Sequence, residues 1–309
     1  MRTISIVSGC YNEEDNLKEL FSRVWAVAAK HPEYTWEYVV IDNCSTDRSP
    51  EILREAAAKE PRLKVIFNVR NFGHIRSPYH AMLQANGDAV IFLASDLQDP
   101  PEFIEQFLSK WEAGWKVVAA IKNQSEESAL FFAARRLYYQ IIARLADVDL
   151  LRNFTGFGLY DRAVIELMRA SEDPYPYHRG QISEFGFPVA RIPFVQPRRK
   201  RGFSKNNIYT LFDIAMLGFT NHTKVPLRLA SIAGFLMAML CLLVSLSYLA
   251  YKMFNWESFS LGTAPVVVGL FFIGSVQLFF IGVIGEYIGA IHTKVTKRPL
   301  VVERERLNF

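Results

Sequence analysis

The first part of the chain alternates short apolar runs with longer segments of helical periodicity. Five runs have the length and composition of buried strands: ISIVSGC (4–10), EYVVID (37–42), LKVIFN (63–68), DAVIFLA (88–94) and WKVVAAI (115–121). Helical patterns separate them, such as the one from about Glu13 to Lys30. Continuous apolar strands between helices predict an α/β fold with a mostly parallel sheet that helices cover on both faces.

Two of the predicted helices begin with recognisable capping residues. Ser49, Pro50 and Glu51 supply an N-cap residue, a proline at the first helical position and an early acid. Asp99 precedes two prolines and an acid, so we predict that it caps the next helix. Between them, a further helix is expected over about 77–85.

Two long uncharged segments follow in the last third of the chain. Leu229–Tyr251 and Ser258–Gly285 contain no Asp, Glu, Lys or Arg, and each exceeds the roughly 20 residues that a helix needs to cross a bilayer. With the short polar link between them, they predict a hairpin of two transmembrane helices over about 226–251 and 262–288. Buried core helices are the alternative.

Lysine and arginine are concentrated on either side of this hairpin, whereas the connecting loop contains only Lys252. They are Arg198, Arg199, Lys200, Arg201, Lys205, Lys224 and Arg228 before the hairpin, and Lys294, Lys297, Arg298, Arg304 and Arg306 after it. This bias predicts a multi-pass protein of the cell (inner) membrane, with both termini and the N-terminal domain in the cytoplasm. We expect no signal peptide, because acidic residues follow the first short apolar run.

Composition and charge indicate which class of partner the protein binds. The chain has 309 residues, half of them hydrophobic, with a formal net charge of +4 and a sequence pI near 8.9. Because the basic residues gather around the hairpin, we interpret the charge as affinity for anionic lipid and not for nucleic acid. Cys10, Cys44 and Cys241 show no metal or disulfide spacing, which suits a reducing cytosol.

Polar motifs follow four consecutive predicted strands. They are CYNEED (10–15), DNCSTD (42–47), NVRNFGH (68–74) and SDLQD (95–99). Ligands of parallel α/β sheets bind beyond the carboxyl ends of the strands, so we expect the four motifs to converge on one edge. Each motif alone has a structural alternative as a cap or turn. A role as cap or turn explains Asp42 and Asp96 less well, because each ends an apolar strand where a carboxylate needs a partner.

Several familiar signatures are missing from the sequence. Neither GxGxxG nor Walker A is present, and neither is HExxH, GxSxG or a paired-cysteine metal pattern. The histidines are scattered. His74, His80 and His178 could be hydrogen-bonded structural groups or ligand contacts, and the sequence leaves both interpretations open.

In their order along the chain, the motifs resemble a known family. The set YNEE, IDNCSTD, RNFGH and DLQDPPE, then VPLRLA at the first span and IGEYIGAIHTKVTKRP at the end of the second, is similar to the polyprenyl-phosphate glycosyltransferases of family two, which include bactoprenol glucosyltransferases and dolichol-phosphate-mannose synthases. The resemblance implies a GT-A catalytic domain over 1–200, an interfacial segment over 201–225, the hairpin within 226–290 and a basic cytoplasmic tail over 291–309.

The resemblance also implies an activity and assigns roles to residues. A hexose would pass from a nucleotide-sugar, UDP-glucose or a related UDP-sugar, to undecaprenyl phosphate or another polyprenyl phosphate, with inversion at the anomeric carbon. The nucleotide-sugar site would comprise Tyr11, Asn12, Glu13, Asp42 and Asn71, with Asp42 on the base. Asp96 would be the catalytic and metal-binding carboxylate at the diphosphate, with Gln98 beside it. The implied cofactor is Mg²⁺ or Mn²⁺.

Three motifs depart from the family pattern. Ala94 stands where D-A-D-L-Q has its first acid, Asn43 replaces the second acid of D-D-G-S-x-D, and TGFG at 155–158 replaces G-D-F-R. A phosphate monoester is already largely dianionic at neutral pH, so the reaction needs no protein base. Magnesium commonly binds through one or two carboxylates together with substrate phosphates, so Asp96 could suffice.

Basic residues are candidates for binding the lipid phosphate. They are Arg135, Arg136, Arg198, Lys200, Arg201 and Lys205. Attraction to anionic headgroups explains the cluster at 198–205 equally well, and both can hold. An apolar stripe over 208–219 fits a helix lying in the bilayer interface, or one packed on a neighbouring helix or subunit. Family members can self-associate through their spans, so the resemblance also allows a homo-oligomer.

Two other functions stay open. A processive polysaccharide synthase is disfavoured, because no QxxRW sequence occurs and two spans offer little room for a polymer channel. A catalytically silent membrane scaffold would keep the fold after losing acidic ligands. Such a scaffold would show no metal-linked binding of a nucleotide-sugar.

Overall fold

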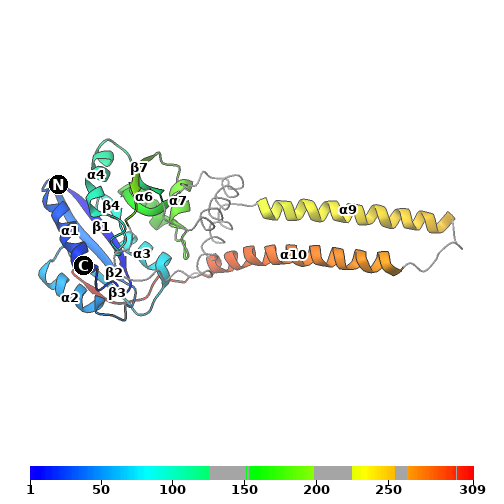
Figure 1. Ribbon diagram of the computed structural model, residues 1–309, viewed down its shortest axis with the longest axis horizontal. Coiled ribbons are helices and arrows are strands. Elements are labelled where there is room, and N and C mark those ends of the chain that lie inside the picture. Colours follow the sequence, from blue (N-terminus) through cyan, green and yellow to red (C-terminus); the bar gives the residue numbers. More distant parts are fainter. Residues whose placement is uncertain (125–150, 152, 198–224, 255–262, 297) are drawn as a thin grey trace.

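The computed structural model describes residues 1–124, 151, 153–197, 225–254, 263–296 and 298–309. It consists of an α/β domain from which two long helices extend side by side (Figure 1). In the first part of the domain the elements are β1 (Arg2–Cys10), α1 (Leu17–Ala29), β2 (Tyr34–Asp42), α2 (Ser49–Lys59), β3 (Leu63–Asn68), α3 (Gly73–Gln84), β4 (Ala89–Phe92), the 3-10 turn η1 (Pro101–Phe103), α4 (Ile104–Glu112) and β5 (Val117–Gln124). The rest are β6 (Phe154–Asp161), α6 (Arg162–Ala170), α7 (His178–Glu184), β7 (Val189–Val195), α9 (Val225–Phe254), α10 (Thr263–Val295) and β8 (Glu303–Leu307).

The eight strands form one sheet in the order β7-β5-β6-β4-β1-β2-β3-β8. Four neighbouring strands, β4, β1, β2 and β3, are parallel, so their carboxyl ends meet at one edge. The predicted convergence of the four polar motifs is therefore confirmed. β5 and β7 are also parallel, whereas β6 and β8 run antiparallel to their neighbours.

Helices cover both faces of the sheet, as predicted. Successive side chains of a strand point to opposite faces, so Ile6 of β1 joins the core under α1, α2 and α4, while Val7 joins the core under α3, α6 and α7. Leu20 of α1 and Met82 of α3 are buried in these two cores. The double cover explains why the parallel strands read as continuous apolar runs.

The helix boundaries differ locally from the prediction. α1 begins at Leu17 instead of about Glu13, and α3 begins at Gly73 instead of about Ser77. The motif after β1 is therefore a loop, whereas the helix after β3 starts within its motif.

At the other end of the domain, β6 lies so close to β5 that a Cβ atom on Gly158 would sit 2.3 Å from the carbonyl oxygen of Val118. Glycine is thus required where the family pattern has arginine.

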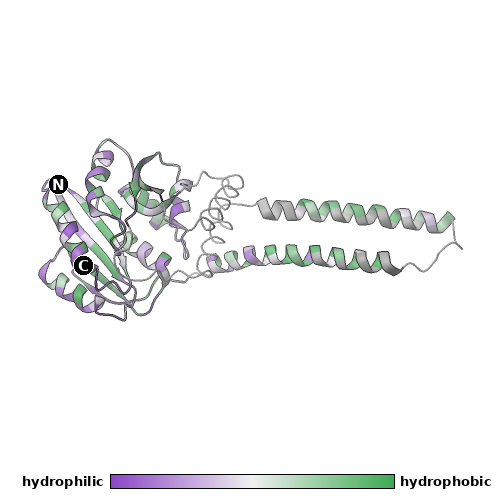
Figure 2. Cartoon of the chain, viewed as in Figure 1, coloured by the Kyte–Doolittle hydropathy of each residue, from purple (hydrophilic) through white to green (hydrophobic). Residues whose placement is uncertain are grey.

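The predicted C-terminal hairpin is present as two antiparallel helices, α9 and α10 (Figure 1). Many of their described side chains are hydrophobic and exposed, among them Phe235 and Leu243 of α9 and Leu278 and Ile281 of α10 (Figure 2). Within the described residues, the segment Phe272–Val295 is long and apolar enough to cross a membrane. The crossing of both helices stays a prediction.

The end of the chain, expected only as a basic tail, returns to the sheet. β8 pairs antiparallel with β3 at the edge. A guanidinium nitrogen of Arg54 lies 2.6 Å from a Glu305 carboxylate oxygen, and Asn308 donates to the carbonyl oxygens of Ala57 (2.8 Å) and Leu63 (2.9 Å). The chain that leaves α10 is therefore fixed beside the strand-end motifs.

Candidate active site

The loop after β1 interlocks with the loop after β2 through Asn12. Its backbone N–H donates to Ser45 Oγ (2.9 Å), its Oδ1 accepts the Thr46 N–H (2.8 Å), and its Nδ2 lies 3.2 Å from Thr46 Oγ1. Asn12 has a φ of 57°, in the left-handed region that asparagine tolerates better than most residues. Both loops are thus held in one conformation by a residue predicted to bind nucleotide.

A second set of hydrogen bonds joins the same loops. The Glu13 N–H donates to Ser49 Oγ (2.9 Å), and the Asp47 carboxylate accepts the N–H groups of Glu14 (3.2 Å) and Ser49 (3.0 Å). The Arg48 N–H donates to Glu14 (2.9 Å). The predicted N-cap role of Ser49 is therefore wrong: Ser49 is already helical, and its hydroxyl bonds to the loop after β1 instead.

Asp42 ends β2 and is fully buried. Its carboxylate accepts the Ser45 N–H, at 3.3 and 3.2 Å from the two oxygens. Burial raises the pKa of Asp42, while the bonds from Ser45 and the charge of Arg304 on β8 oppose that rise. A carboxylate at the end of an apolar strand is expected to need a partner. For Asp42 that partner is the backbone N–H of Ser45, in the turn that follows β2.

Asn43, which stands where the family has a second acid, braces β2 against the start of α3. Its Oδ1 accepts from Asn68 Nδ2 (3.1 Å) and the Phe72 N–H (2.8 Å), and its Nδ2 donates to Asn71 Oδ1 (2.9 Å) and the Gly73 carbonyl (3.2 Å). A carboxylate has no N–H with which to donate. Asn71, predicted at the nucleotide, is exposed beside this brace.

Asp96 and Gln98 lie together in the loop after β4. An Asp96 oxygen accepts the Gln98 N–H (3.1 Å), and Leu97 between them adopts a φ of 61°. The Gln98 amide donates to the carbonyl oxygen of Pro197 (3.3 Å), which follows β7. Asp96 is partly exposed, so its carboxylate is accessible at the same edge as Asp42.

Asp99 has a different place from the one predicted. Its carboxylate accepts the Ala94 N–H (2.9 Å), and the 3-10 turn that precedes α4 follows Pro100 without a side-chain cap, so the N-cap prediction is wrong. Asp99 is only 4% exposed. Burial and the neighbouring Asp96 charge raise its pKa to about 7, against the opposing charge of Lys122. A buried acid that titrates near neutrality thus holds the loop that carries Asp96.

The carboxylates of this loop fit a divalent ion that is shared with a substrate. Among the described residues no three His, Cys, Asp or Glu side chains form a cluster of metal ligands. Asp99 is buried and bonded to a backbone N–H, whereas Asp96 is accessible. One accessible carboxylate is the donor set through which Mg²⁺ binds when phosphate oxygens and water complete its shell.

The histidines have separate environments. His80 Nε2 lies 2.6 Å from a Glu303 oxygen of β8, which is a structural contact. His178 Nε2 lies 2.9 Å from the Tyr160 hydroxyl, which in turn donates to the Gly156 carbonyl (2.6 Å). Burial lowers the pKa of His178 to about 3, so its ring is neutral at physiological pH. His74 and His178 both line a cavity.

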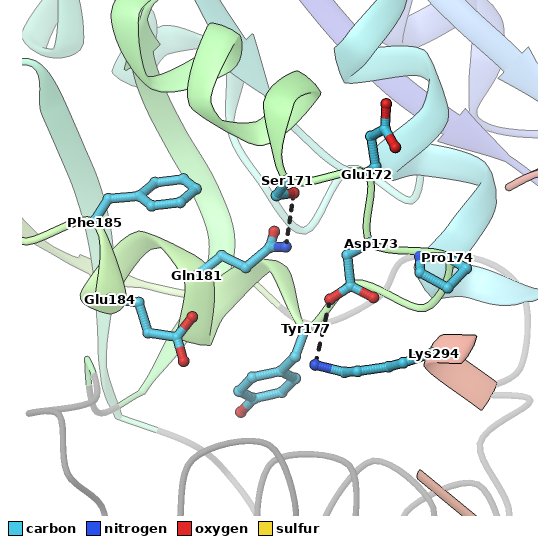
Figure 3. Close-up of a pocket in the computed structure, with 9 residues that line it drawn as sticks. All are labelled: Ser171, Glu172, Asp173, Pro174, Tyr177, Gln181, Glu184, Phe185 and Lys294. Atoms are coloured by element: carbon cyan, nitrogen blue, oxygen red, sulfur yellow. Dashed lines mark hydrogen bonds and ion pairs between the residues drawn. The ribbon is translucent and has the colours of Figure 1, made fainter. Parts of the chain in front are cut away.

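Two cavities lie near the strand-end edge. The first, of about 230 Å³, is enclosed by α3, the end of β4, the start of β6 and the segment that leads into α7. The second, of about 290 Å³, lies between the α6–α7 connection and the end of α10, where Lys294 Nζ is 3.9 Å from an Asp173 oxygen (Figure 3). Tyr177 lines both cavities.

The six predicted lipid-phosphate residues, Arg135, Arg136, Arg198, Lys200, Arg201 and Lys205, lie outside the described residues.

Comparison with known proteins identifies the family. Residues 5–168 match the model of glycosyl transferase family 2, and residues 225–291 match the GtrB C-terminal hairpin. The chain therefore belongs to glycosyl transferase family 2, and the resemblance seen in its motifs is confirmed.

Three relatives match over nearly the whole chain. An uncharacterized glycosyltransferase of Bacillus subtilis (strain 168), YkcC, is 34% identical over 96% of this chain and 92% of its own length. An undecaprenyl-phosphate 4-deoxy-4-formamido-L-arabinose transferase of Pseudomonas fluorescens (strain Pf0-1) is 32% identical over 96% of this chain and 87% of its own. A prophage-derived bactoprenol glucosyl transferase of Shigella flexneri is 30% identical over 96% of both chains.

Proposed function

We propose that this glycosyltransferase moves a hexose from a UDP-sugar to the phosphate of a polyprenyl phosphate, undecaprenyl phosphate, at the cytoplasmic face of the cell membrane. One observation carries the proposal: the apolar hairpin joins the domain at the edge where the strand-end loops converge. Lys294 at the end of α10 reaches Asp173, and Arg76 of α3 donates to the carbonyl oxygen of Pro299. A water-soluble donor and a lipid acceptor would thus meet at one edge.

The relatives support the chemical class of the acceptor. One is named for bactoprenol and another for undecaprenyl phosphate. The extended apolar surfaces of α9 and α10 suit a protein whose second substrate stays in the bilayer (Figure 2). In this proposal both helices span the membrane, and the basic residues around them place the α/β domain on the cytoplasmic side.

The donor would lie across the ends of β1, β2 and β3. Its base would bind at Asp42, with Tyr11, Asn12, Glu13 and Asn71 around the nucleotide. The hydrogen bonds between the two loops hold this half of the site ready before the donor arrives. Its diphosphate would extend toward Asp96 and Gln98 on the loop after β4.

The transfer requires one bond to form and one to break. An oxygen of the lipid phosphate attacks the anomeric carbon, and the bond from that carbon to the diphosphate breaks from the opposite side, which inverts the configuration. UDP departs with the electron pair. The dianionic phosphate monoester already carries the nucleophilic oxygen, so no protein base is required. A divalent ion bound by Asp96 would supply charge stabilisation for the departing diphosphate.

The test is transfer of radiolabel from a panel of UDP-sugars into the organic phase. Purified full-length protein is incubated with undecaprenyl phosphate and Mg²⁺, and a parallel reaction contains EDTA. We expect label from one donor, lost with EDTA, which would identify the sugar as well as the reaction. Absence of label from every donor, in protein shown to be folded and to bind UDP, would contradict the proposed acceptor or sugar.

A further inference from the structure

The smaller cavity, between α3 and α7, has features that the donor site does not explain. We call it the α3–α7 cavity; its walls include Ile75, Pro78, Met82, Phe92, Thr155 and Arg179. Most of these side chains are apolar. An apolar cavity of roughly 150 Å³ holds a benzene molecule, so one of about 230 Å³ has room for a five-carbon isoprene unit.

The α3–α7 cavity is connected to α10 through the larger cavity. Tyr177 forms a wall shared with the larger cavity, and Lys294 of α10 lines the far side of that larger cavity (Figure 3). On the other flank, Arg76 of α3 contacts Pro299, just beyond α10. A lipid chain that follows α10 out of the bilayer would therefore pass the larger cavity and then Tyr177 to reach the α3–α7 cavity.

A neutral histidine and an arginine stand next to each other in the wall of the α3–α7 cavity. His178 is neutral at physiological pH, because burial lowers its pKa. The guanidinium of Arg179 donates one bond to the Phe154 carbonyl (3.3 Å) and stacks on Tyr177, with its carbon 5.4 Å from the ring centre. Within the described residues Arg179 forms no ion pair with a carboxylate, and its bond to Phe154 leaves most of its five N–H donors for an anion.

We propose that the α3–α7 cavity binds the isoprene unit nearest the phosphate of the lipid acceptor, with Arg179 on the phosphate itself. An apolar pocket with one guanidinium at its side matches an apolar chain that ends in an anion. This subsite rests on the proposed function and adds a basis for its selectivity: the enzyme distinguishes a polyprenyl phosphate from other phosphate monoesters by the first unit of the chain.

The probes are farnesyl phosphate and ethyl phosphate, assayed as acceptors with the full-length protein. Only farnesyl phosphate has an isoprene unit that can fill the cavity. In the Arg179→Gln variant we expect the KM for farnesyl phosphate to rise at least tenfold while the KM for the donor is unchanged. Arg191→Gln, on the exposed side of β7, is the matched control and should leave both values unchanged.

Filling the cavity tests the apolar part of the subsite. Ile75→Trp should lower kcat/KM for farnesyl phosphate at least tenfold and leave the weaker value for ethyl phosphate unchanged. Leu167→Trp, on the outer surface of α6, controls for the added indole. If Ile75→Trp does not fold, Thr155→Leu fills the cavity from the opposite wall and should shift the same ratio.

Two results separate this subsite from the proposed function. If the wild-type enzyme transfers sugar but Arg179→Gln and the folded cavity-filling variant keep the wild-type preference for farnesyl phosphate, the subsite is wrong and the function stands. If the wild-type protein transfers nothing, calorimetric binding of farnesyl phosphate decides. Loss of binding in Arg179→Gln and Ile75→Trp would support the subsite in a protein without transferase activity, and unchanged or absent binding would overturn it.

Discussion

The loops after β1 and β2 differ in construction from the loop after β4, although all three meet at the same edge of the sheet. Asn12, Glu13 and Asp47 connect the first two loops through backbone and side-chain bonds that exist without any ligand. The loop after β4 is held by the buried acid Asp99 and by one contact from Gln98 to Pro197. The first half is thus held ready for binding, and the second contains Asp99, a buried acid whose pKa of about 7 lies near neutrality.

The largest difference between the two halves of the site is expected when the charge of Asp96 is removed. Asp96→Asn keeps the shape of the side chain but removes the charge proposed to hold the divalent ion, so kcat should fall by about 10²–10³-fold or more. Thermal stability should stay close to that of the wild type. Asp88→Asn, on an exposed carboxylate at the opposite edge, is the control in the same transfer assay. Wild-type activity in Asp96→Asn would refute its catalytic role.

A smaller but measurable effect is expected for Asp99 on stability. Because the pKa of Asp99 in the folded state is about 7, above the ordinary aspartate value of 3.8, the folded state holds an extra proton between these values, and stability should fall as the pH rises from about 4 through 7. Asp99→Asn keeps an acceptor for the Ala94 N–H and removes the charge. At pH 8 the variant should be more stable than the wild type, by on the order of a few kcal/mol.

Denaturant titrations at pH 4.5 and pH 8 measure this difference. The gap between Asp99→Asn and wild type should be small at pH 4.5 and large at pH 8. Asp88→Asn, whose carboxylate is exposed, controls for loss of an aspartate. An equal gap at both pH values would show that Asp99 does not titrate as its burial implies.

The donor half should respond differently, through binding. Asn12→Ala removes the bonds to Thr46 and places alanine at a φ of 57°, so we expect a loss of stability of about 1–3 kcal/mol. Asn12→Gly removes the same bonds without the strain and should be the more stable of the two. In both variants the KM for the donor should rise more than kcat falls. A change confined to kcat would contradict the division between the halves.

The smallest effect is expected at the sheet edge that the tail completes. Glu305→Gln breaks the ion pair with Arg54, and because both side chains are partly exposed, the free energy of unfolding should drop by less than about 1 kcal/mol. Transfer activity should be unchanged. A large loss of donor binding in this variant would show that β8 belongs to the donor half instead of merely supporting it.

The sequence predicted the parts of the fold that leave a local signal. The strands β1 to β5 are short apolar runs, and their parallel order followed from the helices between them. β8 was missed because its residues, ERERL, alternate charges and contain a single apolar side chain. It is a strand only because β3 offers an unpaired edge.

The prediction of the candidate site was limited in the same way: it found residues with a local signal in the sequence and missed contacts that only the fold creates. Asp42 and Asp96 could be singled out because a carboxylate at the end of an apolar strand is conspicuous in the sequence. Ser49 and Asp99 were assigned to the nearest helix, whereas their partners are Glu13 and the Ala94 N–H. Such bonds depend on which loops the sheet places side by side. The cavity at Arg179 was missed for this reason also, since α3 and α7 meet only in the fold.

The most direct test of the central claim is calorimetric titration of UDP into the full-length protein, with and without Mg²⁺, and with GDP as the comparison. The account predicts binding of UDP that Mg²⁺ strengthens and that Asn12→Ala weakens, because the proposed donor site lies across the loops after β1 and β2. A folded protein that binds neither nucleotide under any of these conditions would contradict it and would favour a membrane scaffold that keeps the fold without the chemistry.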